Sequence, residues 1–209
     1  YNKLVHGTKI GYSKANLDME SLCGIYQDML KEQPVWMTIQ PSMAVLLCKC
    51  VEKYNLKPIQ SLKYIEFTGE MLSEQVRKDV QEKFDCKVAN QYGANEFNSI
   101  AYECPCGNMH LITSNVLVEV YKDGKVLPNG EEGELIITTK TNTAMPLVRY
   151  RLGDMGKIHE KQCECGNMRP VLELTAGRTS DWIITSDGGQ KPVYAIIKAI
   201  DIVNYMSEG

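Results

Sequence analysis

The sequence predicts an α/β fold, in which part of a layered α/β sheet domain is followed by a small antiparallel, barrel-like β region and by the start of a C-terminal α+β domain. Three features lead to this prediction. Helical and strand patterns alternate up to about Tyr92, short apolar runs separated by turn dipeptides follow, and an apolar helical stretch without a core of its own ends the chain. The expected domains are residues 1–103, 104–176 and 177–209.

The first region opens with a helix, a strand and a second helix. Residues 17–33 carry a helical pattern, residues 35–39 form a strand-like run, and residues 42–56 return to a helical pattern. Four cysteines fall within these helices or the next strand and are expected to be small core residues. They are Cys23, Cys48, Cys50 and Cys86.

A strand, a helix and another strand come next. Residues 63–69 are an apolar run that ends in glycine, and residues 86–93 are a second apolar run. Between them, Ser73 suits a helix N-cap and Glu74 suits the positive end of the helix dipole. An apolar stripe at four-residue steps marks one helix face; it consists of Leu72, Val76, Val80 and Phe84. This order predicts two parallel strands with the helix packed over the sheet.

The carboxyl ends of parallel strands meet at one edge of a sheet, where ligands bind. Here those ends are Gly69 and Glu70 after the first strand and residues 92–96 after the second. We therefore expect two candidate binding loops side by side.

The chain beyond Glu96 changes to short strands and turns. Turn dipeptides such as Asp123-Gly124, Asn129-Gly130 and Gly153-Asp154 separate the apolar runs, which predicts a small antiparallel sheet or barrel. The expected strand segments are 99–104, 110–127, 133–139, 146–154, 155–160 and 171–175. A hinge and hairpin over 177–191 and a helix over 193–206 complete the pattern.

Composition excludes several classes of protein. The 209 residues are 44% hydrophobic and 23% charged, as in ordinary globular proteins. No run approaches the about 18 apolar residues of a membrane-spanning helix, and a net charge of -3 gives no broad basic footprint, so neither a membrane nor a nucleic acid is expected as a partner. The chain opens YNKLVHG and stops inside a predicted helix, so we expect an excised fragment.

The loop QYGANEF offers groups that suit a bound ligand. Tyr92 offers a flat ring, Gly93 lets the backbone approach a ligand, and Glu96 offers a carboxylate to a metal or a polar group. Taken alone, the string equally fits an ordinary strand-to-loop turn.

Three other charged residues carry a similar ambiguity. Asp154 follows a glycine turn and suits two hydrogen bonds from vicinal hydroxyls, but it also suits a solvated turn. Arg178 and Asp181 equally fit a surface ion pair, which contributes little to stability.

Taken in order, the strings TGEMLS, YGANE, MPLVRYRLGD and GRTSDWI resemble the adenylate-forming superfamily of acyl-CoA synthetases, amino-acid adenylation domains and luciferases. The segment GEEGELIITTKTNTAMPLVRYRLGD, followed by CxCG and GRTSD, is similar to the branch of phenylacetate-coenzyme A ligases and their capsular-polysaccharide-biosynthesis relatives. The resemblance runs from about Val35 to the end of the chain.

The resemblance implies a nucleotide site. Tyr92 would stack on adenine, Asp154 would bind both ribose hydroxyls, and Arg178 would approach the ribose or phosphate. Gly69 and Glu70 would lie by the adenine and substrate pocket. The implied nucleotide-binding set is Gly69, Glu70, Gln91, Tyr92, Gly93, Ala94, Asn95, Asp154 and Arg178.

Glu96 would be the catalytic carboxylate that holds Mg²⁺ on the ATP phosphates, and Asp181 would be the hinge of the C-terminal domain. The family usually has threonine where this chain has Asn95, so an amide would have to replace the hydroxyl that contacts the α-phosphate.

The implied reaction has two steps. A carboxylate attacks the α-phosphate of ATP to give acyl-AMP and pyrophosphate, and coenzyme A then displaces AMP. An aryl acid such as phenylacetate is the expected substrate, with an amino acid or a sugar-linked acid left open. The protein is expected in the cytoplasm, and a homodimer is left open.

Two expected parts of such an enzyme are missing from these residues. The family's phosphate loop precedes the segment present here, and its adenylation lysine would follow Gly209. We therefore expect residues 1–209 to bind adenosine nucleotides weakly without catalysing adenylation.

The frame C-x-C-G-N-M occurs twice, at 104–109 and 163–168. Two cysteine pairs at turns of one β region suit a tetrahedral, structural Zn²⁺. The ligands would be Cys104, Cys163 and Cys165, with Cys106 or, as relatives in this branch imply, His110 as the fourth.

The paired cysteines also fit disulfides or free thiols, since the C-x-C spacing is less specific for a metal than C-x-x-C. Two rival functions stay open with them. One is a zinc-ribbon interaction module, and the other is a degenerate family member that binds a nucleotide without turnover.

Overall fold

Two compact units make up the chain, residues 1–91 and 92–209. The computed structural model describes residues 2–12, 18–160, 162–176, 182–184, 186 and 189–192. The boundary between the units lies earlier than the boundary at 103/104 expected from the sequence. The reason is that the strand ending at Glu103 pairs with the strand that follows it, which in turn pairs with a later strand of the antiparallel sheet.

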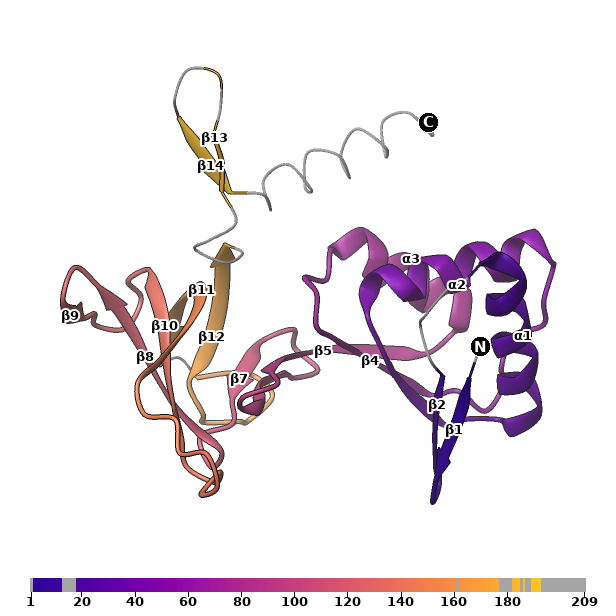
Figure 1. Ribbon diagram of the computed structural model, residues 1–209, viewed down its shortest axis with the longest axis horizontal. Helices are drawn as coiled ribbons and strands as arrows, with labels where there is room; N and C mark the ends of the chain where they lie inside the picture. Colours follow the sequence, from indigo (N-terminus) through magenta and orange to yellow (C-terminus); the bar gives the residue numbers. More distant parts are fainter. Residues whose placement is uncertain are drawn as a thin grey trace. The chain divides into compact units, whose positions relative to one another are not determined.

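The first unit is the expected α/β sheet with helices packed on it (Figure 1). Its three parallel strands are β3 (Trp36–Ile39), β4 (Tyr64–Thr68) and β5 (Lys87–Ala94), and its helices are α1 (Met19–Glu32), α2 (Pro41–Lys53) and α3 (Glu74–Phe84). The strand order β3-β4-β5 follows the sequence, and all three strands are parallel. Because such crossover connections are almost always right-handed, two successive ones in the same direction place α2 and α3 on one face of the sheet. The α/β fold class predicted from the sequence is confirmed.

Two of the helices begin at a residue whose side chain caps the helix. The Ser73 side chain accepts a hydrogen bond from the backbone N–H of Val76 at 3.2 Å, as expected for the N-cap of α3. Asp18 caps α1 in the same way, accepting from the N–H of Ser21 at 2.7 Å. The buried faces of the helices and the strands form one core. Cys23, Cys48, Cys50 and Cys86 all contribute to it, as expected from the sequence. Burial raises the pKa of the Cys48 thiol to about 11.

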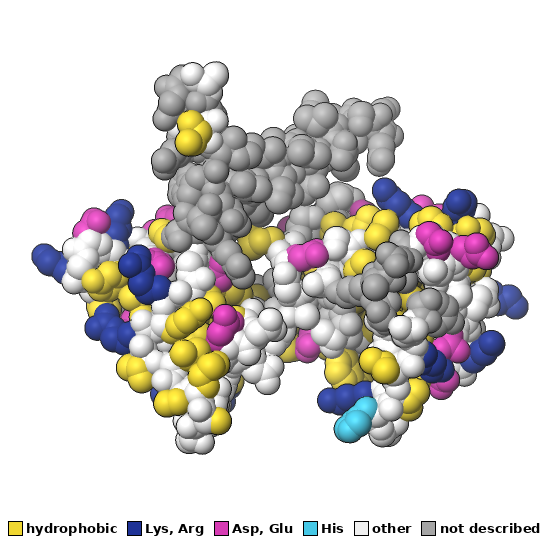
Figure 2. Space-filling model, viewed as in Figure 1, with side chains coloured by type: hydrophobic (Ala, Val, Ile, Leu, Met, Phe, Trp, Pro, Cys, Tyr) yellow, Lys and Arg dark blue, Asp and Glu magenta, His cyan; other side chains and the backbone are white. Residues whose placement is uncertain are grey.

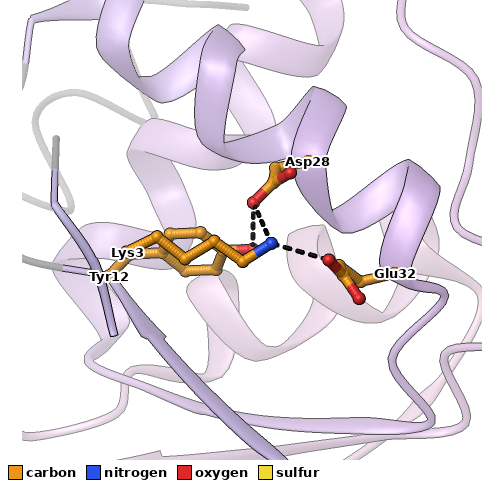
Figure 3. Close-up of polar contacts among 4 residues, drawn as sticks. All are labelled: Lys3, Tyr12, Asp28 and Glu32. Atoms are coloured by element: carbon orange, nitrogen blue, oxygen red, sulfur yellow. Dashed lines mark hydrogen bonds and ion pairs between the residues drawn. The ribbon is translucent and has the colours of Figure 1, made fainter. Parts of the chain in front are cut away.

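A hairpin that the sequence patterns did not reveal precedes α1. Strands β1 (Lys3–His6) and β2 (Lys9–Tyr12) pair antiparallel. The Lys3 ammonium lies 2.8 Å from Asp28 and 2.6 Å from Glu32, and the Tyr12 hydroxyl donates to Asp28 at 3.1 Å (Figure 3). These contacts join the hairpin to α1. Hydrogen bonding from Lys3 lowers the pKa of Asp28, and desolvation raises the pKa of Tyr12 to about 12.

The second unit contains the expected antiparallel sheet (Figure 1). Its described strands follow the order β6-β7-β12-β11-β10-β8-β9. They are β6 (Asn98–Glu103), β7 (Met109–Leu111), β8 (Val116–Lys122), β9 (Lys125–Val126), β10 (Gly133–Thr139), β11 (Tyr150–His159) and β12 (Val171–Ala176). The turn between β8 and β9 has positive φ at both Asp123 and Gly124, the conformation that a tight hairpin requires.

A short hairpin of β13 (Trp182–Ile184) and β14 (Gln190–Pro192) begins inside the expected hinge and hairpin segment and ends one residue beyond it. The helix expected over 193–206 lies outside the described residues.

Charges are mixed on the surface. In Figure 2 the described basic and acidic side chains of the first unit are interspersed over the face shown, which agrees with the small net charge of the chain. No helix among the described residues has both the length and the apolar character needed to cross a bilayer.

Candidate metal centre and nucleotide-binding residues

Three cysteines and a histidine converge in the second unit. The ligand atoms of Cys104, His110, Cys163 and Cys165 all lie within 4.8 Å of one another. Pairing brings them together: β7, which carries His110, lies between β6, which ends just before Cys104, and β12, which follows the loop with the other two cysteines. Residues 59 positions apart in the sequence, such as Cys104 and Cys163, therefore meet at one end of the sheet.

The separations match the edges of a metal-centred tetrahedron. Cys104 Sγ lies 3.7 Å from Cys163 Sγ, and Cys165 Sγ lies 3.4 Å from His110 Nε2. Zinc bonds of about 2.3 Å to sulfur and about 2.0 Å to nitrogen give tetrahedral edges of about 3.8 and about 3.5 Å. A disulfide would need a sulfur–sulfur distance of about 2.05 Å, and these cysteines are free thiols.

His110 is oriented for metal binding through Nε2. Its ring is buried, and Nδ1 lies 2.8 Å from the backbone oxygen of Arg169. A carbonyl oxygen only accepts hydrogen bonds, so Nδ1 carries a proton, and in the neutral ring Nε2 then has the free lone pair. A carbonyl partner on the far nitrogen is the usual support of a metal-bound histidine.

The repeated hexapeptide forms the same turn twice. The N–H of Gly107 donates to the carbonyl of Cys104 at 2.9 Å, and the N–H of Gly166 donates to the carbonyl of Cys163 at 3.0 Å. Both glycines have φ near +80°, a left-handed conformation that favours glycine. The frame is repeated because each copy builds one arm of the cluster.

Hydrogen-bond donors surround the sulfur atoms. The Asn108 side chain donates to Cys163 Sγ at 3.2 Å, and the N–H of Asn167 donates to Cys165 Sγ at 3.4 Å. A hydrogen bond from the backbone of Cys165 is the largest effect that lowers the pKa of Cys163, to about 6. The backbone of Asn167 acts to lower the pKa of Cys165, but the side chains of Cys163 and Cys104 act against it and raise that pKa to about 11. Lower thiol pKa values favour the thiolate form that binds metals.

Cys106, the other proposed fourth ligand, is exposed and lies outside the group of four. Desolvation is the largest effect that raises its pKa.

The expected adenine and ribose residues contact each other in the second unit. The Tyr92 hydroxyl, at the end of β5, donates to Asp154 Oδ2 on β11 at 2.7 Å. Glu96 lies in the loop after β5, close to Tyr150, the first residue of β11. The Tyr150 hydroxyl is 3.5 Å from Glu96 Oε1. Two positions of the YGANE loop therefore face two positions of β11.

Three of the other predicted residues lie in the first unit. Thr68 pairs with Gln91 in the parallel register, and its hydroxyl donates to Gln91 Oε1 at 2.6 Å, so the end of β4 does lie beside β5 as expected. Gly69 follows at φ +80°. Glu70 accepts hydrogen bonds from the backbone N–H and the hydroxyl of Ser42 at 3.0 and 2.8 Å.

Glu70 thus caps the N-terminus of α2, whose own N-cap residue, Gln40, makes no side-chain capping bond. Sequence reasoning missed this role. A helix that begins with Gln-Pro and lacks a capping side chain is the signal that could have indicated an outside acceptor.

The other predicted residues lie at the end of β5, on the turn after it, or outside the described residues. Gly93 and Ala94 end β5, and the N–H of Phe97 donates to the carbonyl of Ala94 at 3.1 Å, which turns the chain. Asn95 is exposed on this turn. Arg178 and Asp181 lie outside the described residues.

Asn115 is a further residue that sequence reasoning missed. Its side-chain amide donates to the carbonyls of Phe97 and Ser99 at 2.8 and 2.7 Å, and its oxygen accepts from Thr141. It therefore holds the loop after Glu96. Nothing in the string TSNVL distinguishes such an asparagine from an ordinary turn residue.

Comparison with known proteins assigns the family. The model of the AMP-binding enzyme family matches residues 1–145, so the chain belongs to this family, and the adenylate-forming membership predicted from its motifs is confirmed. A phenylacetate-coenzyme A ligase of Thermus thermophilus is 32% identical over 177 residues, which cover 80% of this chain and 40% of that protein. Protein CapK of Staphylococcus aureus is 26% identical over 122 residues, which cover 58% of this chain and 26% of that protein. Both belong to the branch predicted from the sequence.

The fold has solved counterparts. An open conformation of 2-hydroxyisobutyryl-CoA ligase in complex with 2-HIB-AMP and CoA aligns with a TM-score of 0.71 at 20% identity, covering 87% of this chain and 43% of that one. In the sequence comparison, the chain spans about two fifths of the length of the Thermus thermophilus phenylacetate-coenzyme A ligase.

Proposed function

We propose that the chain is part of an ATP-dependent, AMP-forming acid–CoA ligase that acts on an aryl acid such as phenylacetate. An oxygen of the carboxylate attacks the α-phosphorus of ATP, and pyrophosphate leaves. The sulfur of coenzyme A then attacks the acyl carbon, and AMP leaves. The family and its phenylacetate-coenzyme A ligase relatives support this reaction class.

The observation that carries the proposal is the contact between Tyr92 and Asp154. A ring next to a carboxylate, held by strands 62 positions apart, offers one face to a base and acceptor oxygens to vicinal ribose hydroxyls. The aromatic side chain packs against the core of its unit, which keeps this pair in place. These are the groups that an adenosine site needs.

The phosphates would be bound by neighbouring residues. Glu96 would hold Mg²⁺, which would neutralise negative charge on the phosphates, and the amide of Asn95 would contact the α-phosphate. Arg178 would approach the ribose or phosphate, and Asp181 would serve as the hinge. The protein's contribution is positioning and charge stabilisation, which is why the site needs no nucleophile of its own.

We also propose that Cys104, His110, Cys163 and Cys165 hold a structural Zn²⁺. The distances and the orientation of His110 support this assignment. Four protein ligands leave no position for a reactive water. The ion would tie the connection between β6 and β7 to the connection between β11 and β12. We also propose a cytoplasmic location, because the proposed enzyme class works in a reducing compartment.

Pyrophosphate exchange tests the catalytic proposal. Full-length protein containing this chain is assayed for acid-dependent exchange of pyrophosphate into ATP with aryl, fatty and amino acids. We expect exchange with aryl acids, its loss in Glu96→Gln, and no acyl-AMP from residues 1–209 alone. Folded, metal-replete protein that exchanges with no acid would favour a degenerate nucleotide binder, and failure to bind adenosine nucleotides would favour a zinc module.

A further inference from the structure

A ring that stacks on adenine does not need the hydroxyl group that Tyr92 carries. Stacking uses the face of the ring, and phenylalanine would serve equally well. The hydroxyl instead donates to Asp154 Oδ2 at 2.7 Å, a distance typical of a strong O–H···O⁻ hydrogen bond. The ring that would bind the base is thus bonded to the carboxylate that would bind the sugar.

Asp154 lies where the strand ladder is interrupted. In the pairing of β10 with β11, Glu134 faces Met155 and Ile136 faces Arg151. Residues 152–154 are therefore opposite a single residue of β10, and Gly153 has φ +89° within this bulge. In a bulge, side chains no longer alternate regularly between the two faces of the sheet. The direction of the Asp154 side chain therefore depends on the contacts that this side chain makes.

The same relation recurs four positions along each segment. Tyr92 and Glu96 lie on one segment, and Asp154 and Tyr150 lie on the other. Tyr92 faces Asp154, and Tyr150 faces Glu96 at 3.5 Å. Each segment offers one tyrosine and one carboxylate, so each proposed ligand carboxylate has a phenol from the opposite segment. The shorter of the two bonds, Tyr92 to Asp154, carries the inference below.

We propose that Tyr92 is a positioning residue that confers selectivity for the ribose diol through Asp154. The inference rests on the proposed function, because it takes Asp154 as the ribose ligand. An ionised carboxylate has about four lone-pair sites, so one bond from Tyr92 leaves capacity for two ribose hydroxyls. The tyrosine hydroxyl holds the Asp154 carboxylate in one orientation. The ribose hydroxyls can then bind to the carboxylate without the entropy cost of ordering its side chain.

The experiment compares Tyr92→Phe with wild-type full-length protein, with Tyr54→Phe as the matched control. Tyr54 is the C-cap residue that follows α2 in the first unit, and it is 41% exposed. Dissociation constants are measured by titration calorimetry for ATP and for 2′,3′-dideoxyATP, which lacks the diol. Because a hydrogen bond to a charged group is lost, we expect Tyr92→Phe to weaken ATP binding about tenfold. The dideoxy nucleotide should bind the variant and the wild type alike.

Selectivity is the readout that separates positioning from a general structural role. Equal weakening of both nucleotides by Tyr92→Phe, or unchanged selectivity for ATP, would overturn the inference while leaving the proposed function intact. Wild-type protein that binds neither nucleotide would overturn both. In exchange assays, the expected change is a higher KM for ATP at nearly constant kcat, and Tyr54→Phe should match wild type in each measurement.

Discussion

The Nδ1 atom of His110 lies 2.8 Å from the backbone oxygen of Arg169. This bond fixes the ring so that Nε2 faces Cys165 Sγ at 3.4 Å. The supporting group is a backbone atom, so no side-chain substitution removes it, and the orientation belongs to the fold itself.

Metal removal should unfold the second unit. Structural zinc contributes on the order of 10 kcal/mol to folding of small domains, and the cluster joins segments that are distant in sequence. Protein purified without chelators should contain one zinc per chain by elemental analysis. Adding a strong chelator should then reduce the β-sheet signal in circular dichroism and leave the contribution of the first unit. Absence of stoichiometric metal would refute the assignment.

Single cysteine substitutions distinguish the ligands. Cys163→Ser should lose zinc, because its buried sulfur lies in the group of four, whereas Cys106→Ser should keep zinc because its sulfur is exposed and outside the group. Zinc content and melting temperature are measured for both variants. Loss of zinc in Cys106→Ser would identify Cys106 as a ligand and count against His110.

Gly156→Ala tests the close approach of β11 and β12. A Cβ at this position would lie 2.8 Å from the backbone oxygen of Glu173, and a backbone atom cannot move aside cheaply. We expect a loss of about 1–3 kcal/mol in the free energy of unfolding, measured by denaturant titration. Gly11→Ala is the control, since its Cβ would meet no atom within 4 Å. Equal stability of the two variants would contradict the packing described.

The N-terminal hairpin should detach from α1 as pH falls. The pKa of Asp28 is lowered in the folded state, so its contribution to stability is present above the unfolded value of about 3.9 and is lost as pH falls through the folded value. Lys3 has a raised pKa, so its contribution is lost only in strong base. The protection factors of the β1 and β2 amides, which are corrected for the pH dependence of intrinsic exchange, should fall below about pH 4.

Lys3→Met removes the partner of Asp28 and should flatten this pH dependence. The variant should show faster exchange of the hairpin already at neutral pH. If the protection factors of the wild type are unchanged across the acid range, the ion pairs do not hold the hairpin.

Much of the first unit could be predicted from the sequence because its signals are local. The stripe ending at Phe84, the cap at Ser73 and the glycine at 69 each act within a few residues, and the parallel pairing follows from connection length and handedness. The hairpin before α1 was not predicted, because its two strands have only four residues each and none of those residues is buried.

In the candidate sites too, features that depend on neighbouring residues could be predicted, and features that depend on strand pairing could not. The order of motifs was enough to predict the family, and the doubled C-x-C-G-N-M frame was enough to predict two equivalent turns, because a turn depends on neighbouring residues. The choice of His110 for the group of four, the capping of α2 by Glu70 and the bond from Tyr92 to Asp154 depended on which strands pair and in what register. Those contacts join residues far apart in the chain, and their geometry arises from the packing of the whole sheet rather than from any local pattern.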